Sequence, residues 1–193
     1  AQRYYRRYNK LKNRETTARD QLEKAYSDRE YFLNLLHQMD AITTSDEVEE
    51  IREELVEEGI LKFRSSNKKK KKHKFQLHEF RTTNGLTVLV GKNNKQNDYL
   101  TSKKAQNNHL WFHTKDIPGS HVVITHSPAE IEEQDILEAA MIAAFHSKAG
   151  SSESVPVDYT DIKHVHKISG AKPGFVTYTD QKTVFVTPVE ADI

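Results

Sequence analysis

The spacing of apolar residues predicts a long helix over residues 3–40, a stretch without Gly or Pro. Positions spaced alternately four and three apart hold Tyr4, Tyr8, Leu11, Glu15, Ala18, Leu22, Ala25, Arg29, Phe32, Leu36 and Met39. Nine of these eleven residues are apolar, which is the pattern of a coiled-coil seam. Because a seam needs a partner, we expect either a dimer through this helix or a fragment whose other coiled-coil arm is missing.

A second, shorter helix is predicted to begin after Thr44 and to end at Gly59. Thr44 is a good N-terminal cap, the acidic residues after it suit the first turn, and Gly59 suits the C-terminal end. Residues 65–74, SSNKKKKKHK, are basic and of low complexity. They are typical of a solvated linker or of a strap that contacts phosphate groups, and the sequence favours neither.

From Phe75 onward the apolar period changes from helical spacing to alternation, which predicts strands. The predicted elements are a hairpin over 75–91 with an Asn84-Gly85 turn, a short helix over 97–106 capped by Asn97 or Asp98, a hairpin over 109–126, a helix from Pro128 to Gly150, an extended segment over 155–167, and a hairpin over 175–187. Short hairpins with one main helix packed on the sheet predict an α+β fold with a mostly antiparallel sheet. The predicted domains are a coiled-coil arm with a short helix (1–62), a basic linker (63–74) and the α+β domain (75–193).

Composition narrows the classes of function that the chain can have. The absence of Cys excludes a disulfide scaffold, a thiolate metal site and a Cys nucleophile. No apolar run approaches the roughly 20 residues of a membrane span, and the first 30 residues do not resemble a signal peptide. A cytoplasmic protein is therefore expected. The net charge of +1 is sorted by segment, since residues 1–14 carry six basic groups and no acid whereas residues 46–58 carry eight acids.

Neither a metal site nor catalysis is expected from the histidines and acids. His109 and His113 have the spacing of helical metal ligands, but on a strand they would lie about 13 Å apart. No G-x-S-x-G motif is present. The sequence therefore predicts no enzyme, metal or cofactor, with an enzyme that acts on RNA through His113 and Asp116 as a weak alternative.

Residues 91–121 combine amides, lysines and aromatic rings. Asn side chains offer donors and acceptors, Lys side chains offer charge, and Trp111, the only Trp, could stack on a base. This combination is typical of RNA contact, but the same residues could equally be caps, turns and core. Alternation places Trp111 and His113 on one face of a strand and Leu110 and Phe112 on the other. If Leu110 and Phe112 form the core, we expect Trp111 and His113 to be an exposed pair beside Lys115.

Three stretches of the chain resemble the NFACT-R domain of the NFACT family. They are GKNNKQNDYLTSKKAQNNHLWFHTKDIPGSHVVI from residue 91, AAMIAAFHSKAGSSESVPVDYT from residue 139, and GAKPGFVTYTDQKTVFVTP from residue 170. The resemblance covers about residues 75–189, and residues 1–59 resemble the returning coiled-coil arm of the same family. The family includes bacterial RqcH proteins, also described as FbpA-type fibronectin-binding proteins, and eukaryotic NEMF.

The resemblance implies an RNA-binding module of a ribosome-associated quality-control factor. The implied partners are the large ribosomal subunit, tRNA and peptidyl-tRNA, and the implied role is support of C-terminal alanine tailing on stalled subunits. A fibronectin-binding adhesin at the cell surface is the alternative. The candidate RNA-binding residues are Asn93, Asn94, Asn97, Asp98, Lys103, Lys104, Trp111, His113, Lys115, Asp116, Gly119, Ser120, His121, Lys148, Lys172 and Gly174.

Overall fold

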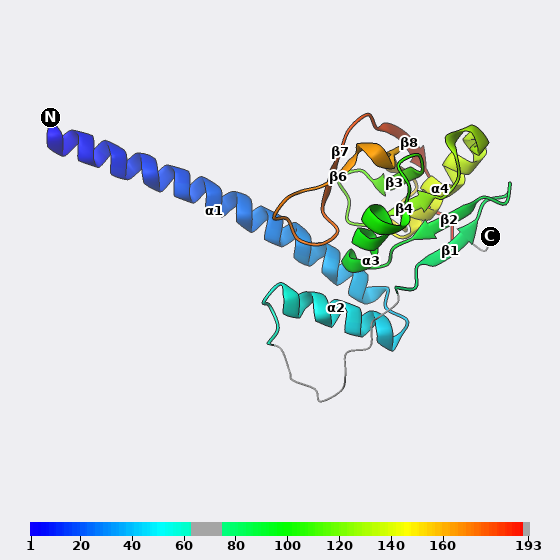
Figure 1. Ribbon diagram of the computed structural model, residues 1–193. Coiled ribbons are helices and arrows are strands. Elements are labelled where there is room, and N and C mark those ends of the chain that lie inside the picture. Colours follow the sequence, from blue (N-terminus) through cyan, green and yellow to red (C-terminus); the bar gives the residue numbers. More distant parts are fainter. Residues whose placement is uncertain (63–74, 191–193) are drawn as a thin grey trace. The chain divides into compact units, whose positions relative to one another are not determined.

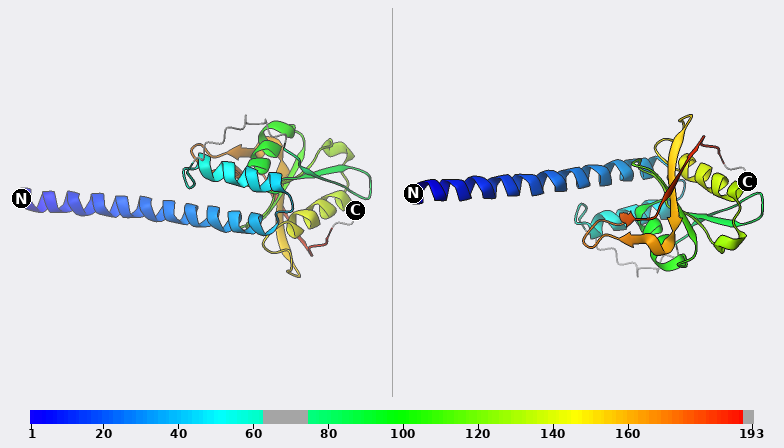
Figure 2. Two further views of the ribbon diagram at one scale, coloured as in Figure 1. Left: turned by 90° about the horizontal axis from the view of Figure 1, so that it is seen from below. Right: turned by 90° about the horizontal axis from the view of Figure 1, so that it is seen from above.

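The computed structural model describes residues 1–62 and 75–190, in two compact units, Ala1–Asn34 and Leu35–Ile193 (Figure 1). The predicted basic linker, residues 63–74, lies outside the described residues. Helix α1, Gln2–Asp40, confirms the predicted long helix, and its part in the first unit is continuous and nearly straight (Figure 2). Side chains of the predicted seam are exposed there, including Tyr4 at 78% and Leu22 at 55%. Pairing through the seam stays a prediction.

Helix α2, Ser45–Glu57, begins and ends where the sequence predicted. The Thr44 side chain accepts a hydrogen bond from the Glu47 backbone amide, and the Glu47 carboxylate accepts one from the Thr44 amide in return. This reciprocal pair satisfies amides that the first helical turn leaves without partners. Gly59 follows the helix at φ +72°, a conformation that Gly adopts without steric cost.

The second unit is built on a six-stranded antiparallel sheet in the order β1-β2-β4-β3-β5-β8. The strands are β1 His78–Arg81, β2 Thr87–Val90, β3 Leu110–Thr114, β4 Val122–Ile124, β5 Val155–Asp161 and β8 Lys182–Val186. Two predicted hairpins are confirmed, β1–β2 across Asn84-Gly85 and β3–β4 across the loop that contains Pro118-Gly119. The predicted α+β class with a mostly antiparallel sheet is thereby confirmed.

The predicted third hairpin is wrong. Strand β7, Val176–Tyr178, pairs with β6, Val165–Lys167, in a separate two-stranded sheet, while β8 pairs with β5. Strand β5 is seven residues long and gives β8 five paired positions, which place Val186 beside Val155 in the core. Burial of the β8 valines against β5 therefore outweighs the short local turn that β7 and β8 would otherwise form.

Helix α3, Asn94–Tyr99, begins earlier than the sequence predicted. Its N-terminal cap is Asn93, whose side chain accepts a hydrogen bond from the Gln96 amide at 2.8 Å, rather than Asn97 or Asp98. The helix continues as a π-helical turn, η1, over Leu100–Lys104, which closes with a bond from the Ala105 amide to the Leu100 carbonyl. The hydroxyl of Thr101 donates to the Asn97 carbonyl within this turn.

Helix α4, Glu133–Phe145, is shorter than the predicted helix that would run from Pro128 to Gly150. Pro128 instead opens a separate 3₁₀ turn, η2, over Pro128–Glu130, and a further 3₁₀ turn, η3, covers Ile162–His164. The Asp135 carboxylate accepts the Glu132 amide and thereby fixes the later start of α4. The small residues of α4 allow close packing on the sheet.

Both faces of the central strands are buried. On one face α4 packs against a cluster that includes Val88, Phe112 and Val122. On the other face Leu89, Trp111 and Val123 pack with Leu100 of η1 and Ile162. A sheet covered on both sides leaves little of its central surface for a ligand, so contacts with partners fall on loops, edges and the covering helices.

Candidate nucleic-acid interface

The amides of the Asn-rich stretch bond to acids of α2. The side-chain amides of Asn93 and Gln96 both donate to one Glu50 carboxylate oxygen at 2.7 Å. The Asn94 amide donates to Glu54 at 2.8 Å. All five side chains are buried. These amides therefore hold α3 on α2. This is a structural role, which the sequence left open as the alternative to RNA contact.

The remaining bonds of Asn94 and Asn97 tie α3 to other parts of the unit. Gln38, at the end of α1, donates to the Asn94 side-chain oxygen at 2.8 Å and accepts the Asn94 backbone amide at 3.2 Å. The Asn97 side-chain oxygen accepts the backbone amide of His121 at 3.0 Å, at the entrance to β4. A Cβ on Gly91 would lie 2.4 Å from that same Asn97 oxygen, so the chain needs Gly at this position.

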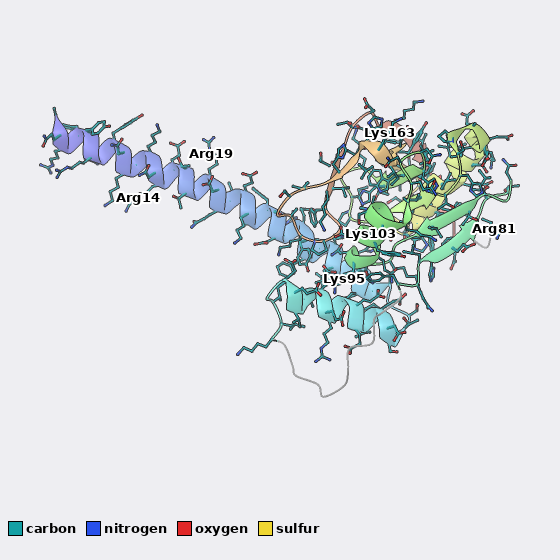
Figure 3. All side chains as sticks on the ribbon, in the orientation of Figure 1. Arg14, Arg19, Arg81, Lys95, Lys103 and Lys163 are labelled. Carbon is teal, nitrogen blue, oxygen red and sulfur yellow. The ribbon has the colours of Figure 1, made fainter. Side chains whose placement is uncertain are left out.

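Two lysines of the stretch also face α2. The Lys92 ammonium lies 3.2 Å from Glu47, and the Lys95 ammonium lies 3.1 Å from Glu57 (Figure 3). Burial alone would raise the pKa of Glu47, but hydrogen bonds from the Thr43 backbone and from Lys92 outweigh it and lower that pKa. Glu47 therefore stays ionised beside Lys92.

Trp111, His113 and His121 form a buried aromatic cluster rather than an exposed pair. The Trp111 side chain is 0% exposed, and its ring stacks on His113 with 5.8 Å between centroids. His121 meets the same indole edge-on at 5.3 Å. The expectation that Trp111 would be exposed once Leu110 and Phe112 form the core is wrong, because η1 and β7 cover the second face of the sheet.

Acid should destabilise the domain through His121. Burial lowers the pKa of this imidazole well below 6.5, and the nearby His113 lowers it further. The unfolded chain therefore takes up the proton first, so His121 lowers the free energy of unfolding below pH 6.5 by about 1.4 kcal/mol per pH unit. His113 and His146, whose pKa values burial also lowers, add to this loss. Denaturant unfolding at pH 7.5, 6.5 and 5.5, followed by Trp111 fluorescence, should show this slope. His121→Gln should make the slope shallower by about 1.4 kcal/mol per pH unit, whereas the exposed-site variant His166→Gln should leave it unchanged. Equal slopes in His121→Gln and the parent would contradict the assignment.

The loop that carries Lys172 and Gly174 is fixed to α3 by Asp98. The Asp98 carboxylate accepts the Gly174 amide at 2.9 Å and forms an ion pair with Lys167. Gly174 has φ +82°, and a Cβ there would lie 2.7 Å from the Asn94 side-chain oxygen. Lys172 is half-buried. The structure thus brings Asn94, Asp98 and Gly174 together, which the sequence could not show.

The other candidates lie around the β3–β4 loop and the end of α4. Gly119 forms a β-bridge with Ser147, and a Cβ there would be 2.8 Å from the Thr114 hydroxyl. The Ser120 amide donates to the His146 carbonyl and the Lys148 amide to the Pro118 carbonyl. The side chains of Lys115, Asp116 and Lys148 are exposed, whereas Ser120 is buried. Only the charged members of this group are available to a large partner.

Lys103, labelled in Figure 3, and Lys104 are exposed on η1. Lys104 lines a hollow of about 680 Å³. Neither lysine forms an ion pair with any residue that the structure describes. Phe75 and Tyr99 line the hollow with their ring centroids 5.1 Å apart, together with Lys104. Sequence reasoning missed this aromatic pair. One signal was available for Tyr99: it lies four residues before Lys103 in a helical stretch, which places the ring and the lysine on the same face.

Comparison with known families agrees with the resemblance. The model described as "NFACT protein RNA binding domain" matches residues 71–180, more than half of the chain, and the one described as "NFACT N-terminal and middle domains" matches residues 1–74. The chain belongs to the NFACT family. The family predicted from the three sequence stretches is thereby confirmed, and it includes factors of ribosome quality control.

Individual NFACT relatives extend the comparison along the whole chain. The chain is 53% identical over 190 residues to "Rqc2 homolog RqcH" of Bacillus subtilis (strain 168) and 47% identical over 195 residues to that of Streptococcus suis (strain 05ZYH33). These matches cover 97% and 100% of the chain, but only 33% and 34% of the relatives. The chain therefore spans about a third of the length of these curated relatives.

A solved structure shares the NFACT fold described above. It is the C-terminal part of the fibronectin/fibrinogen-binding protein from Streptococcus suis, with a TM-score of 0.89 and 44% identity over 98% of this chain and 75% of that one. Among the residues that the structure describes, no helix is both long enough and apolar enough to cross a membrane.

Proposed function

We propose that the domain from residue 75 onward binds RNA through Lys103, Lys104 and the adjoining hollow. The observation that carries this proposal is the pair of exposed lysines beside the Phe75–Tyr99 rings. Lysines that are not held by acids can displace counterions from phosphates, and each contact strengthens binding at low salt. The description of the family model as RNA-binding supports RNA binding by this domain.

The composition of the hollow favours unpaired bases. Phe75 and Tyr99 are only partly buried, so a base could stack on them, a contact that contributes about 1–3 kcal/mol. The hollow is also lined by two exposed carboxylates, Asp46 of α2 and Glu79 of β1. Those carboxylates repel phosphate but accept hydrogen bonds from base amino groups, which keeps the backbone on the lysine side. Single-stranded or looped RNA fits this arrangement better than a duplex.

The RNA that we propose is tRNA or the rRNA of a stalled large ribosomal subunit. The support is kinship with proteins named "Rqc2 homolog RqcH" and with the NFACT RNA-binding domain. In this role the domain binds and positions RNA in the cytoplasm without catalysing a reaction, and it supports C-terminal alanine tailing by the complete factor.

The variant Lys103→Ala/Lys104→Ala should bind RNA more weakly than the parent chain. Loss of two phosphate contacts should lower affinity for tRNA roughly ten- to thirtyfold at 0.15 M salt and make the log–log salt slope shallower by about 1.4, the value for two contacts to an unpaired strand. Fluorescence anisotropy with labelled tRNA between 0.05 and 0.3 M KCl measures both quantities. A stability change is not expected, since both side chains are exposed.

A matched control removes the same charge elsewhere. Lys163→Ala/Lys182→Ala changes two exposed lysines, of which Lys163 is already paired with Asp161 at 2.7 Å, and should leave the salt slope nearly unchanged. Equal losses in both double variants would mean that RNA does not select the η1 lysines. Binding with no dependence on salt would reject RNA contact through phosphates altogether.

Fibronectin binding is the second candidate, because the solved relative is named for it and β8 is an edge strand with Phe185 69% exposed. A peptide that pairs with such an edge does so through main-chain hydrogen bonds. Fibronectin binding of this kind should therefore survive the Lys103→Ala/Lys104→Ala change that weakens RNA binding.

A further inference from the structure

A smaller hollow of about 270 Å³ lies in the second unit and shares His78 with the larger hollow beside η1. It is enclosed by the end of α1, strand β1, the segment before α3 and the residues that follow α4. The polar side chains that the argument uses are His37, Thr43, His78, Lys92, Ser120 and His146. Three of the ten histidines of the chain therefore meet at one cavity, although they are far apart in sequence.

Packing fixes His146 at the centre of this group. Its ring lies 5.3 Å from the ring of Phe145, 5.7 Å from Phe80 and 6.4 Å from His78, measured between centroids. Its backbone carbonyl accepts the Ser120 amide at 3.0 Å, and the His37 Nε2 atom lies 3.5 Å from the same carbonyl. The three imidazoles thus come from separate elements that are held together by the core.

The hollow is rich in donors and poor in acids. None of the described side chains that line it is acidic. The nearby carboxylate of Glu47 on α2 is 3.2 Å from Lys92, so the two charges offset each other. Burial lowers the pKa of His146 to about 4, with further lowering by His78, Lys92 and His37. The pKa of His78 is also lowered, by burial and then by Lys92, while Glu47 opposes that change.

We propose that this pocket binds a phosphate group. Lys92, the imidazoles of His37, His78 and His146, and the hydroxyls of Thr43 and Ser120 are donors or can become donors, which suits an anion with several oxygens. A metal cation is a poor alternative because none of the described side chains that line the wall is a carboxylate. The groups of three His, Cys, Asp or Glu side chains that hold metals are also absent from the described residues.

Binding should be coupled to the uptake of a proton. Burial, with Lys92, favours the neutral form of His78 and His146, but a bound anion would stabilise the imidazolium form and so raise the pKa values of these two rings. If one proton is taken up, affinity increases by up to about tenfold for each pH unit below neutrality. The groups that set this dependence are His37 on α1, Glu47 on α2, His78 on β1, Lys92 before α3 and His146 after α4.

Titration of the 193-residue chain with inorganic phosphate and with sulfate tests the pocket. Sulfate stays a dianion between pH 6 and pH 7.5, so any pH dependence of its binding belongs to the protein. Histidine ring signals in NMR spectra should shift and saturate for His37, His78 and His146, with tighter binding at pH 6 than at pH 7.5. Signals that do not saturate, or that shift equally for the exposed His166, would overturn the proposal.

Variants locate the site without disturbing the core. His37→Gln/His78→Gln should weaken sulfate binding at pH 6 by about tenfold or more, because two rings that can be protonated are lost. His166→Gln, at an exposed position on β6, should bind as the parent does. His146 is left intact because its ring packs in the core. Equal affinity in the double variant and the parent would show that the anion binds elsewhere.

Two arms distinguish the source of the phosphate. The first arm compares a 5′-phosphorylated RNA tetranucleotide with its 5′-hydroxyl form. The pocket binds an RNA end if the phosphorylated form displaces sulfate at a lower concentration than inorganic phosphate does and the hydroxyl form does not displace it. In the second arm, displacement by inorganic phosphate alone assigns the pocket to the free anion. The pocket shares His78 with the wall of the larger hollow, but neither Lys103 nor Lys104 lines it. Sulfate should therefore still bind to Lys103→Ala/Lys104→Ala, so failure of either proposal leaves the other testable.

Discussion

Replacement of Trp111 with Ala should lower the free energy of unfolding by about 3–5 kcal/mol. Trp111 is among the largest side chains that are completely buried, and it packs with Leu89, Leu100 and Val123 on the face of the sheet opposite α4. The shortened side chain would leave a cavity between the sheet and the elements η1 and β7 that cover it, and these cannot move together to close it. It would also remove the ring on which His113 stacks. Urea denaturation followed by far-ultraviolet circular dichroism measures the loss.

Two further substitutions show whether the loss comes from packing. Trp111→Phe should cost clearly less than Trp111→Ala, because an aromatic ring is retained and the indole N–H makes no hydrogen bond among the described residues. Phe185→Ala removes an aromatic side chain that is 69% exposed and should change stability by less than about 0.5 kcal/mol. A Trp111→Ala loss as small as that of Phe185→Ala would mean that Trp111 is on the surface, as RNA stacking would require.

Replacement of Asn94 with Ala should also be costly, at about 2–3 kcal/mol, because a buried hydrogen bond to a charged group is lost. The change removes the donor that lies 2.8 Å from the Glu54 carboxylate, and Glu54 is 0% exposed. A buried carboxylate that loses a hydrogen-bond donor carries the cost of its lost hydration. The bond from Gln38 to Asn94 is lost as well, which loosens the end of α1 from α3. Unfolding can be followed by the fluorescence of Trp111, the only Trp.

Asn108→Ala is the matched control for this change, because it removes the same amide from an exposed position. It should alter stability by less than about 0.5 kcal/mol. RNA binding separates structure from function here: at temperatures where the Asn94→Ala variant is still folded, its affinity for tRNA should equal that of the parent. A folded Asn94→Ala variant that binds tRNA weakly would instead make Asn94 a direct RNA contact.

Local signals in the sequence predicted the local structure well. Thr44 and Gly59 flank the two ends of α2, as their preferences for helix caps indicate, and Asn84-Gly85 joins the first two strands. The third hairpin failed because its outcome depends on competition for β5, a strand more than 20 residues earlier in the chain. Turn residues indicate only local backbone preferences. They cannot predict a strand pairing that is decided by burial between strands far apart in the sequence.

The candidate site shows a similar division. Asn and Lys residues in one stretch indicated polar contacts correctly, but the sequence could not show that their partners would be Glu50 and Glu54 of α2. Alternation placed Trp111 and His113 on one face correctly, yet it could not show that η1 and β7 would cover that face. Composition identifies the chemistry of side chains, whereas their exposure depends on tertiary contacts.

In the π-helical turn η1, the direction in which the exposed lysines point depends on the number of residues in the turn. The bond from Ala105 to Leu100 spans five residues, one more than an α-helix uses. Each residue turns a helix by about 100°. A homologue with one residue fewer between Leu100 and Ala105 could keep both lysines and still aim them a quarter-turn away. Insertions and deletions in this short segment should therefore separate relatives with different RNA preferences more sharply than substitutions do.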